Sequence, residues 1–128
     1  LDGVREYARK KGVSEHIEFM GSRTDISRFY QAMDLFLFPS FHEGLPIAGV
    51  EAQTADLPCL FSDAITREIM ITDRAVSMPL DSGAAKWAKK SISLAKTYGR
   101  RNVSDKITAA GYDTADMGKR MGRIYEQQ

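Results

Sequence analysis

Residues 36–63, FLFPSFHEGLPIAGVEAQTADLPCLFSD, decide the fold of this chain. The apolar run at residues 35–38 is continuous rather than alternating, which is typical of a strand buried on both faces in a parallel sheet covered by helices. Pro46 suits the start of a helix because its missing N–H needs no partner there, and the helix should run over residues 46–55. Residues 58–61 predict the next strand. The stretch therefore indicates strand, loop, helix and strand in that order.

Two carboxylates flank the predicted helix start. Glu51 stands among small apolar residues, where a carboxylate is costly unless something hydrogen-bonds to it, and Glu43 lies in the loop before the helix. The N–H groups of Gly44, Leu45 and the first turn should favour an anion such as a phosphate. Phosphates on these N–H groups and hydroxyls on the carboxylates describe a nucleotide sugar. Taken singly, Glu43 could simply stabilise the helix N-terminus, and Glu51 could pair with Arg67 or another base.

The same residues resemble the signature of retaining glycosyltransferases of the GT-B fold, family 4 type, and most closely the branch that builds capsular and exopolysaccharides. The signature rests on Ser40, Glu43-Gly44, Leu45-Pro46, Glu51-Ala52 and Leu57-Pro58. The resemblance extends to Phe19 to Gly21, Tyr30 to Asp34, Ser62-Asp63 and Trp87-Ala88. It implies that the whole protein is a hexosyltransferase, which transfers a sugar from a UDP-sugar to a saccharide or lipid-linked acceptor with retention.

By position, the resemblance implies that Glu43 is catalytic and contacts the transferred sugar, while Glu51 holds the ribose hydroxyls. His42 could orient Glu43 or touch the donor, although a loop residue beside a site often only shapes it. The predicted donor-binding residues are Ser40, His42, Gly44, Leu45, Pro46 and Glu51. We expect no cofactor. We also expect no metal, because two isolated histidines lack the spacing of metal ligands.

The remaining strands and helices alternate. Strands are predicted at residues 17–21, 35–38, 58–61 and 76–80, which favours a three-layer, Rossmann-like α/β/α fold with a mostly parallel sheet. Helices are expected up to Gly12, after a cap at Asp25, over residues 64–72, and from Gly83 to the end of the chain. Asp113 should cap the last helix, which carries Met117, Met121 and Ile124 on one face, and Trp87 should belong to the core.

Composition indicates one globular domain. Of 128 residues, 43% are hydrophobic and 27% are charged, and no apolar run approaches the roughly 20 residues of a membrane span. We expect a cytoplasmic protein because no signal-peptide pattern opens the chain. Cys59 lies in a predicted strand, so we interpret it as a buried structural thiol rather than a nucleophile.

Basic residues gather in the C-terminal third. Residues 84–128 carry ten bases against four acids, although the formal net charge of the chain is only +1. Such a surface could attract acidic lipid head groups at the inner face of a membrane. A solvated helix surface is the alternative that we favour, since the bases form no compact run. Nucleic-acid binding has no support, because no motif or aromatic interleaving accompanies the charge.

Relative to the resembled family, residues 1–128 look like part of the C-terminal, nucleotide-sugar-binding domain, truncated on its N-terminal side. The N-terminal acceptor domain of the same chain and the first two strands of the nucleotide domain should be missing, so this piece should be inactive alone. Unpaired edges on an apolar sheet would favour self-association. The alternative function is a non-catalytic nucleotide-binding or assembly module of the same fold.

Overall fold

The computed structural model of the chain describes residues 2–96 and 99–126, except the side chains of residues 120–122 and 124–126. Its helices are α1 (Asp2–Lys10), α2 (Ile26–Ala32), α3 (Ile47–Thr54), α4 (Ala84–Ala95), α5 (Ser104–Ala109) and α6 (Thr114–Glu126). Its strands are β1 (Phe36–Phe38), β2 (Cys59–Ser62) and β3 (Ala75–Met78). Short 3-10 turns are η1 (Ser14–His16), η2 (Arg67–Ile69) and η3 (Leu80–Ser82).

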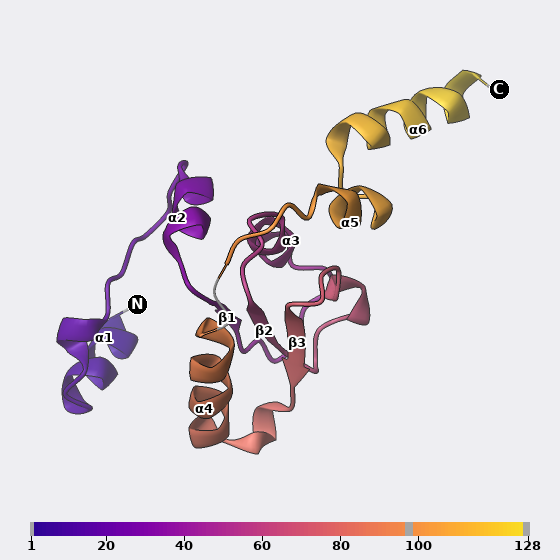
Figure 1. Cartoon of the computed structure of the whole chain (residues 1–128). Coiled ribbons are helices and arrows are strands. Elements are labelled where there is room, and N and C mark those ends of the chain that lie inside the picture. The colour runs from indigo at the N-terminus through magenta and orange to yellow at the C-terminus, as the bar shows by residue number, and fades with distance from the viewer. Residues whose placement is uncertain (1, 97–98, 127–128) are drawn as a thin grey trace.

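The sheet is parallel throughout, in the order β1-β2-β3 (Figure 1). Phe36 pairs with Cys59, which in turn pairs with Ala75, so the three strands start level with one another. The central strand β2 is buried along its whole length. An open parallel sheet packed against helices, with α3 between β1 and β2, confirms the predicted Rossmann-like α/β fold, with three strands in the described residues rather than four.

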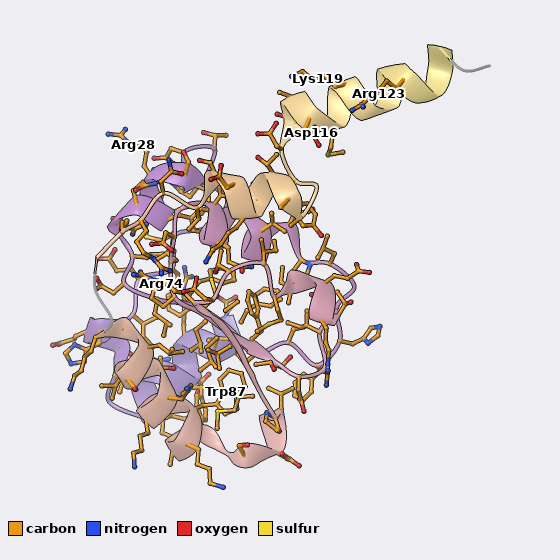
Figure 2. All side chains as sticks on the ribbon, turned by 45° about the vertical axis from the view of Figure 1, so that its right-hand side comes forward. Arg28, Arg74, Trp87, Asp116, Lys119 and Arg123 are labelled. Atoms are coloured by element: carbon orange, nitrogen blue, oxygen red, sulfur yellow. The ribbon has the colours of Figure 1, made fainter. Side chains whose placement is uncertain are left out.

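Helices cover both faces of the sheet. Phe36 and Phe38 point to the α3 face, where their rings contact Phe61 edge-on at 6.1 and 6.4 Å between centroids. Leu37, between them, points to the opposite face and lines an open apolar groove with residues of α4, among them Trp87. Trp87 lies between α4 and the strands, and its indole N–H donates to the Pro79 carbonyl at 3.0 Å (Figure 2).

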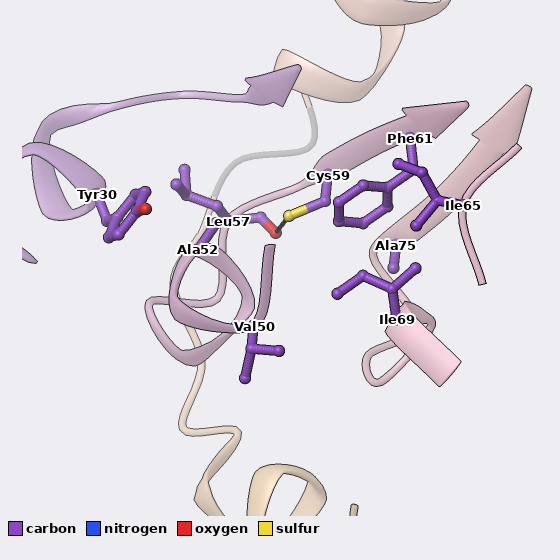
Figure 3. Packing of buried hydrophobic residues seen from close by; sticks show 9 residues of the cluster. All are labelled: Tyr30, Val50, Ala52, Leu57, Cys59, Phe61, Ile65, Ile69 and Ala75. Carbon is purple, nitrogen blue, oxygen red and sulfur yellow. Dashed lines mark hydrogen bonds between the residues drawn. The ribbon is translucent and has the colours of Figure 1, made fainter. Parts of the chain in front are cut away.

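The main core lies between the sheet, α2 and α3 (Figure 3). Its buried members are Tyr30, Val50, Ala52, Leu57, Cys59, Phe61, Ile65, Ile69 and Ala75. Gly49 lets α3 approach the sheet closely, since a Cβ atom there would lie 2.8 Å from Cε1 of Phe61. Cys59 is fully buried and its thiol donates to the Leu57 carbonyl at 3.3 Å, which confirms a structural role.

The predicted strand at residues 17–21 is wrong. These residues form no regular element after η1, and Ile17 and Met20 are 39% and 43% exposed. A single strand needs a neighbour to take its backbone hydrogen bonds, and no described strand lies beside this segment. The prediction that residues 35–38 are buried on both faces is also wrong, because Leu37 is 47% exposed.

The predicted helix over residues 64–72 is wrong as well, since only the turn η2 forms there. Gln53, a fully buried residue of α3, binds this loop instead. Its amide nitrogen donates to the Ile69 carbonyl at 2.7 Å, and its oxygen accepts from the N–H groups of Ile71 and Thr72 at 3.2 and 3.0 Å. Several residues of this loop are β-branched, which disfavours a helix, and the glutamine satisfies the backbone in its place.

Helix ends agree with the sequence in part. After α1, Gly12 adopts a positive φ of 69°, and the Asp113 carboxylate accepts from the N–H of Asp116 at 2.9 Å at the start of α6, as predicted. Asp25 precedes α2 but makes no capping bond, because Arg23 binds its carboxylate with two nitrogens. Pro46 is the residue before α3 rather than its first residue.

The segment after α4 returns to the core through two arginines. Arg100 donates to the Ala55 carbonyl at the end of α3 and to three carbonyls at the end of α2, those of Tyr30, Gln31 and Met33, at 2.7 to 2.8 Å. We call this set the Arg100 clasp. Arg101 binds the buried Asp56, whose carboxylate also accepts from the Arg101 N–H at 2.6 Å.

The last helix, α6, extends away from the sheet (Figures 1 and 2). Met117 in it is 48% exposed. The side chains of Met121 and Ile124, predicted to share its face, lie outside the described residues. At the other end of the chain, α1 buries only Ala8.

Candidate functional site

The loop between β1 and α3 leaves the carboxyl edge of the sheet, where open α/β folds bind ligands. Backbone contacts fix this loop at two points. The Ser62 hydroxyl, at the end of β2, donates to the Ser40 carbonyl, and Glu43 forms an isolated parallel bridge with Ile65. Ser40 in turn donates from its hydroxyl to the His42 carbonyl at 3.3 Å. The side chains of His42 and Glu43 are left exposed to solvent at this edge.

The loop then delivers the chain to the N-terminus of α3. Gly44 is exposed, Leu45 packs against the core, and Pro46 is buried with an extended backbone. The Pro46 carbonyl accepts from the N–H of Gly49 at 2.9 Å and starts the helical hydrogen bonds. The N–H groups of Ile47 and Ala48, the first two residues of α3, have no acceptor within the helix and point beyond its N-terminus. An anion bound there stays a prediction of the sequence.

Glu51 lies on the exposed side of α3, where the hydroxyl of Tyr30 in α2 donates to its Oε2 at 3.2 Å. Because Glu51 is exposed to solvent, the expectation that its carboxylate is costly without a hydrogen-bond partner is wrong, and the bond from Tyr30 orients the carboxylate rather than offsetting its burial. The sequence also allowed a purely structural role for Glu51 as the ion-pair partner of Arg67. Among the described residues no ion pair joins these two side chains. The two side chains open into a cavity of about 220 Å³ between α2 and α3, lined also by Ile26, Ser27, Gln31, Thr54 and Ala55.

The predicted site residues form two groups. Ser40, His42, Glu43 and Gly44 share the loop at the carboxyl edge, whereas Glu51 lies one to two turns into α3 with Tyr30. Among the described contacts, none links Glu51 to Glu43, and the cavity beside Glu51 includes no residue of the loop. A ligand that touches both acids would have to extend along the N-terminal half of α3.

A second polar cavity, of about 180 Å³, lies at the carboxyl ends of β2 and β3. Ser62, Asp63, Thr66, Arg67 and Ser77 contribute its polar side chains. Ser62 is buried, and its hydroxyl ties β2 to the Ser40 carbonyl, which is a structural role. The loop that carries this cavity also carries Ile65, the partner of Glu43, which joins both features to one edge of the sheet.

Burial governs the ionisation of two groups near Glu51. Burial first, and then the hydrogen bond and the charge of Glu51, raise the pKa of Tyr30 to about 12, so the phenol keeps its proton and stays a donor. Burial, with a smaller contribution from Asp56, raises the pKa of the Cys59 thiol to about 12. A thiol in that state is a poor nucleophile, which agrees with a structural cysteine.

Within the described residues, no cluster of three or more histidine, cysteine or carboxylate side chains is placed to hold a metal ion. In the same part of the chain, none of the helices has the length and apolar character needed to cross a bilayer.

Sequence reasoning missed two residues that shape this region. The sequence marks Tyr30 only as the start of the resembled segment Tyr30 to Asp34, although a tyrosine where phenylalanine would pack equally well signals a partner for its hydroxyl. Gln53 was not singled out, yet it stands in the same apolar helix as Glu51 and raises the same question of what satisfies it. Both found their partners more than fifteen residues away in the sequence.

The fold and the edge loop define an α/β domain with an open parallel sheet and a polar ligand-type site at its carboxyl end. The chain belongs to the family described as "Glycosyl transferases group 1", which matches residues 2–97. The Rossmann-like fold is that of a GT-B glycosyltransferase domain, as the resemblance implies.

Curated relatives support this assignment. "Putative glycosyltransferase EpsF" of Bacillus subtilis (strain 168) is 31% identical over 118 residues, which cover 86% of this chain and 29% of the relative. "UDP-Gal:alpha-D-GlcNAc-diphosphoundecaprenol alpha-1,3-galactosyltransferase" of Escherichia coli is 37% identical over 57 residues, 44% of this chain and 15% of the relative. "Lipopolysaccharide glucosyltransferase WaaG" of Escherichia coli (strain K12) is 42% identical over 53 residues, 41% of this chain and 14% of the relative.

The chain thus spans less than a third of the length of these relatives. No solved structure matches it.

Proposed function

We propose that this chain is part of the nucleotide-sugar-binding domain of a retaining, family 4 type glycosyltransferase that builds cell-surface polysaccharide in the cytoplasm. The whole protein would transfer a hexose from a UDP-sugar to a saccharide or lipid-linked acceptor. The acceptor-binding domain would come from polypeptide beyond these 128 residues, in line with the greater length of the relatives. Names that mention polysaccharide or lipopolysaccharide among those relatives support the pathway, and the capsular and exopolysaccharide branch is our assignment within it.

The observation that carries this proposal is the loop from Ser40 to Pro46. It presents Glu43 and the first N–H groups of α3 at the edge of the sheet where α/β folds bind ligands. In the proposed site these N–H groups, with Ser40, Gly44, Leu45 and Pro46 around them, bind the diphosphate. Developing charge on the departing nucleoside diphosphate is then stabilised by fixed dipoles that need no reorganisation.

Glu43 is proposed as the catalytic carboxylate that contacts and positions the transferred sugar, with His42 beside it. Backbone pairing of Glu43 with Ile65 supports this role, because it holds the loop while leaving the carboxylate in solvent. Glu51 is proposed to accept hydrogen bonds from the ribose hydroxyls. Its exposed position and the bond from Tyr30 support that assignment, since a carboxylate already oriented loses less freedom when a ligand binds.

An NMR titration of this chain with uridine diphosphate tests the proposal. We expect shifts that cluster at Gly44 to Glu51 and that weaken in Glu51→Ala. Glu6→Ala, which removes an exposed carboxylate from α1, is the matched control and should leave the shifts unchanged. Shifts scattered over the surface, or equal in all three proteins, would contradict the proposed site.

A non-catalytic nucleotide-binding or assembly module of the same fold is the second candidate. The N-terminus of α3 and the Glu51 carboxylate would serve nucleotide binding in such a module without any transfer. The two functions separate in the whole protein, where Glu43→Gln should abolish sugar transfer while nucleotide binding persists. Transfer that survives this change would favour a different catalytic group.

Two partner surfaces complete the proposal. The open edge of β1 and the apolar groove of about 580 Å³ beside Leu37 would favour self-association of this chain, which sedimentation at increasing concentration would detect. Helix α4 carries Lys86, Lys89 and Lys90 and no acid, so we propose peripheral contact with anionic lipid. Vesicles with and without anionic lipid test that contact.

A further inference from the structure

We propose that Tyr30 is a positioning residue for the nucleotide site: its hydroxyl holds the Glu51 carboxylate in the orientation that accepts the ribose hydroxyls. This inference rests on the proposed function of Glu51. It concerns a residue on a different helix, one that does not itself touch the nucleotide in the proposed arrangement. The two side chains are joined by one hydrogen bond of 3.2 Å between helices α2 and α3.

Packing leaves the Tyr30 ring little freedom. The residue is 5% exposed and belongs to the main core (Figure 3). Its ring meets the Phe36 ring edge-on with 6.1 Å between centroids. Glu51, by contrast, is exposed on α3 and would be free to change rotamer without a partner. A fixed donor therefore restrains a mobile acceptor, and it does so from the core side of the cavity that both line.

The chemistry of the pair assigns one oxygen to the protein and leaves the other to a ligand. Tyr30 donates to Oε2 of Glu51. An ionised carboxylate has about four acceptor positions on its two oxygens, so Oε1 can still accept from a pair of neighbouring hydroxyls. The raised pKa of Tyr30 fits this arrangement, since the phenol keeps its proton and remains the donor over the working range of pH.

The Arg100 clasp maintains the distance between the two helices. Its guanidinium donates to the Tyr30 carbonyl itself, to two further carbonyls at the end of α2, and to the Ala55 carbonyl just after α3. The backbone of the donor residue is thus anchored to the helix that carries the acceptor. The hydroxyl of Tyr30 binds Glu51, and its carbonyl binds Arg100. These two contacts set the relative position of Tyr30 and Glu51 before any ligand binds.

The test is a double-mutant cycle on this chain with two probes, uridine diphosphate and 2′,3′-dideoxyuridine diphosphate. Tyr30→Phe removes only the hydroxyl and keeps the buried ring. We expect it to weaken uridine diphosphate binding roughly three- to tenfold, as the loss of one ordinary hydrogen bond would, because the exposed Glu51 carboxylate stays hydrated. In the Glu51→Ala background, Tyr30→Phe should change the affinity for uridine diphosphate less than about 1.5-fold. It should change the affinity of the wild-type chain for the dideoxy probe equally little. Tyr7→Phe, on the exposed side of α1, is the matched control and should change neither.

The cycle separates this inference from the proposed function. If Glu51→Ala weakens uridine diphosphate but Tyr30→Phe does not, the positioning role alone is wrong. Tyr30→Phe could also lower the affinity for both probes equally, or lower the affinity for uridine diphosphate equally with and without the Glu51 carboxylate. Either result would show that the hydroxyl has a structural role only, and would overturn the positioning role. If Glu51→Ala leaves uridine diphosphate binding unchanged, the ribose contact fails, and the positioning role falls with it.

A second readout needs no nucleotide. Ultraviolet titration of the phenols, with Tyr30→Phe as the reference, isolates the ionisation of Tyr30. Glu51 and Cys59 are the titratable groups whose charge acts on it, and Arg100 contacts its carbonyl. In Glu51→Ala we expect Tyr30 to ionise at lower pH than in the wild type. An unchanged titration would show that the hydroxyl does not bind Glu51 in solution and would refute the inference.

Discussion

Replacement of Gln53 by alanine should destabilise the chain far more than its position in an apolar helix suggests. The glutamine is fully buried and binds three backbone groups of the loop after β2: the Ile69 carbonyl and the N–H groups of Ile71 and Thr72. Each would be left without its partner in Gln53→Ala. At about 1 kcal/mol for each group, the low end of the range because water can enter the vacated space, the loss is about 3 kcal/mol.

Such a loss is a large part of the roughly 5–15 kcal/mol that stabilises a typical domain. Urea unfolding followed by the fluorescence of Trp87 measures it. Thr54→Ala is the control on the next residue of the same helix, where an exposed side chain donates only to the Val50 carbonyl, and it should change stability by less than about 0.5 kcal/mol.

Hydrogen exchange gives the same prediction local detail. The amides of Ile71 and Thr72 should lose protection in Gln53→Ala while those of β2 keep theirs. Because the same loop carries Ile65, the bridge to Glu43 should loosen as well. An unfolding free energy within 1 kcal/mol of the wild type, or a loss no larger than that of Thr54→Ala, would refute the reasoning.

Three further changes test the core. Gly49→Val should destabilise by at least about 2 kcal/mol in thermal unfolding, because even a Cβ atom would lie 2.8 Å from the buried Phe61 ring. Asp56→Ala should lower the unfolding free energy by about 2 kcal/mol, and Asp56→Asn by less, since the carboxylate is buried and binds Arg101. The unfolding free energy should fall as the pH rises from about 9 towards about 12, because folded Cys59 keeps a proton that the unfolded thiol releases. Urea titrations at several pH values measure this fall, which should be smaller in Cys59→Ala.

Local patterns predicted the centre of the fold well. The strand, loop, helix and strand over residues 35–62 are present to within one or two residues, because Pro39, Pro46 and Pro58 mark their limits and each element is set by its own sequence. The loop carrying Glu43 followed directly from that order. The placement of the candidate site at the carboxyl edge therefore needed only the sequence and the rule that parallel strands end together.

Contacts distant in sequence decided the rest. Residues 64–72 have a helix-like composition in part, but a side chain of another helix binds their backbone, and no local pattern reveals that. The partial exposure of Leu37 likewise depends on what lies beside an edge strand. The sequence placed Glu51 among apolar residues, but its exposure to solvent and its bond from Tyr30 could be read only from the packing of α2 on α3.

The Arg100 clasp has a consequence for the order in which the chain becomes structured during synthesis. Tyr30 and Glu51 leave the ribosome before the side chain that joins the ends of their helices, which lies 70 residues after Tyr30 and 45 after Ala55. Until that arginine emerges, the carbonyls at both helix ends must be satisfied by water. The cavity between the helices can therefore reach its final shape only after residue 100 has been made.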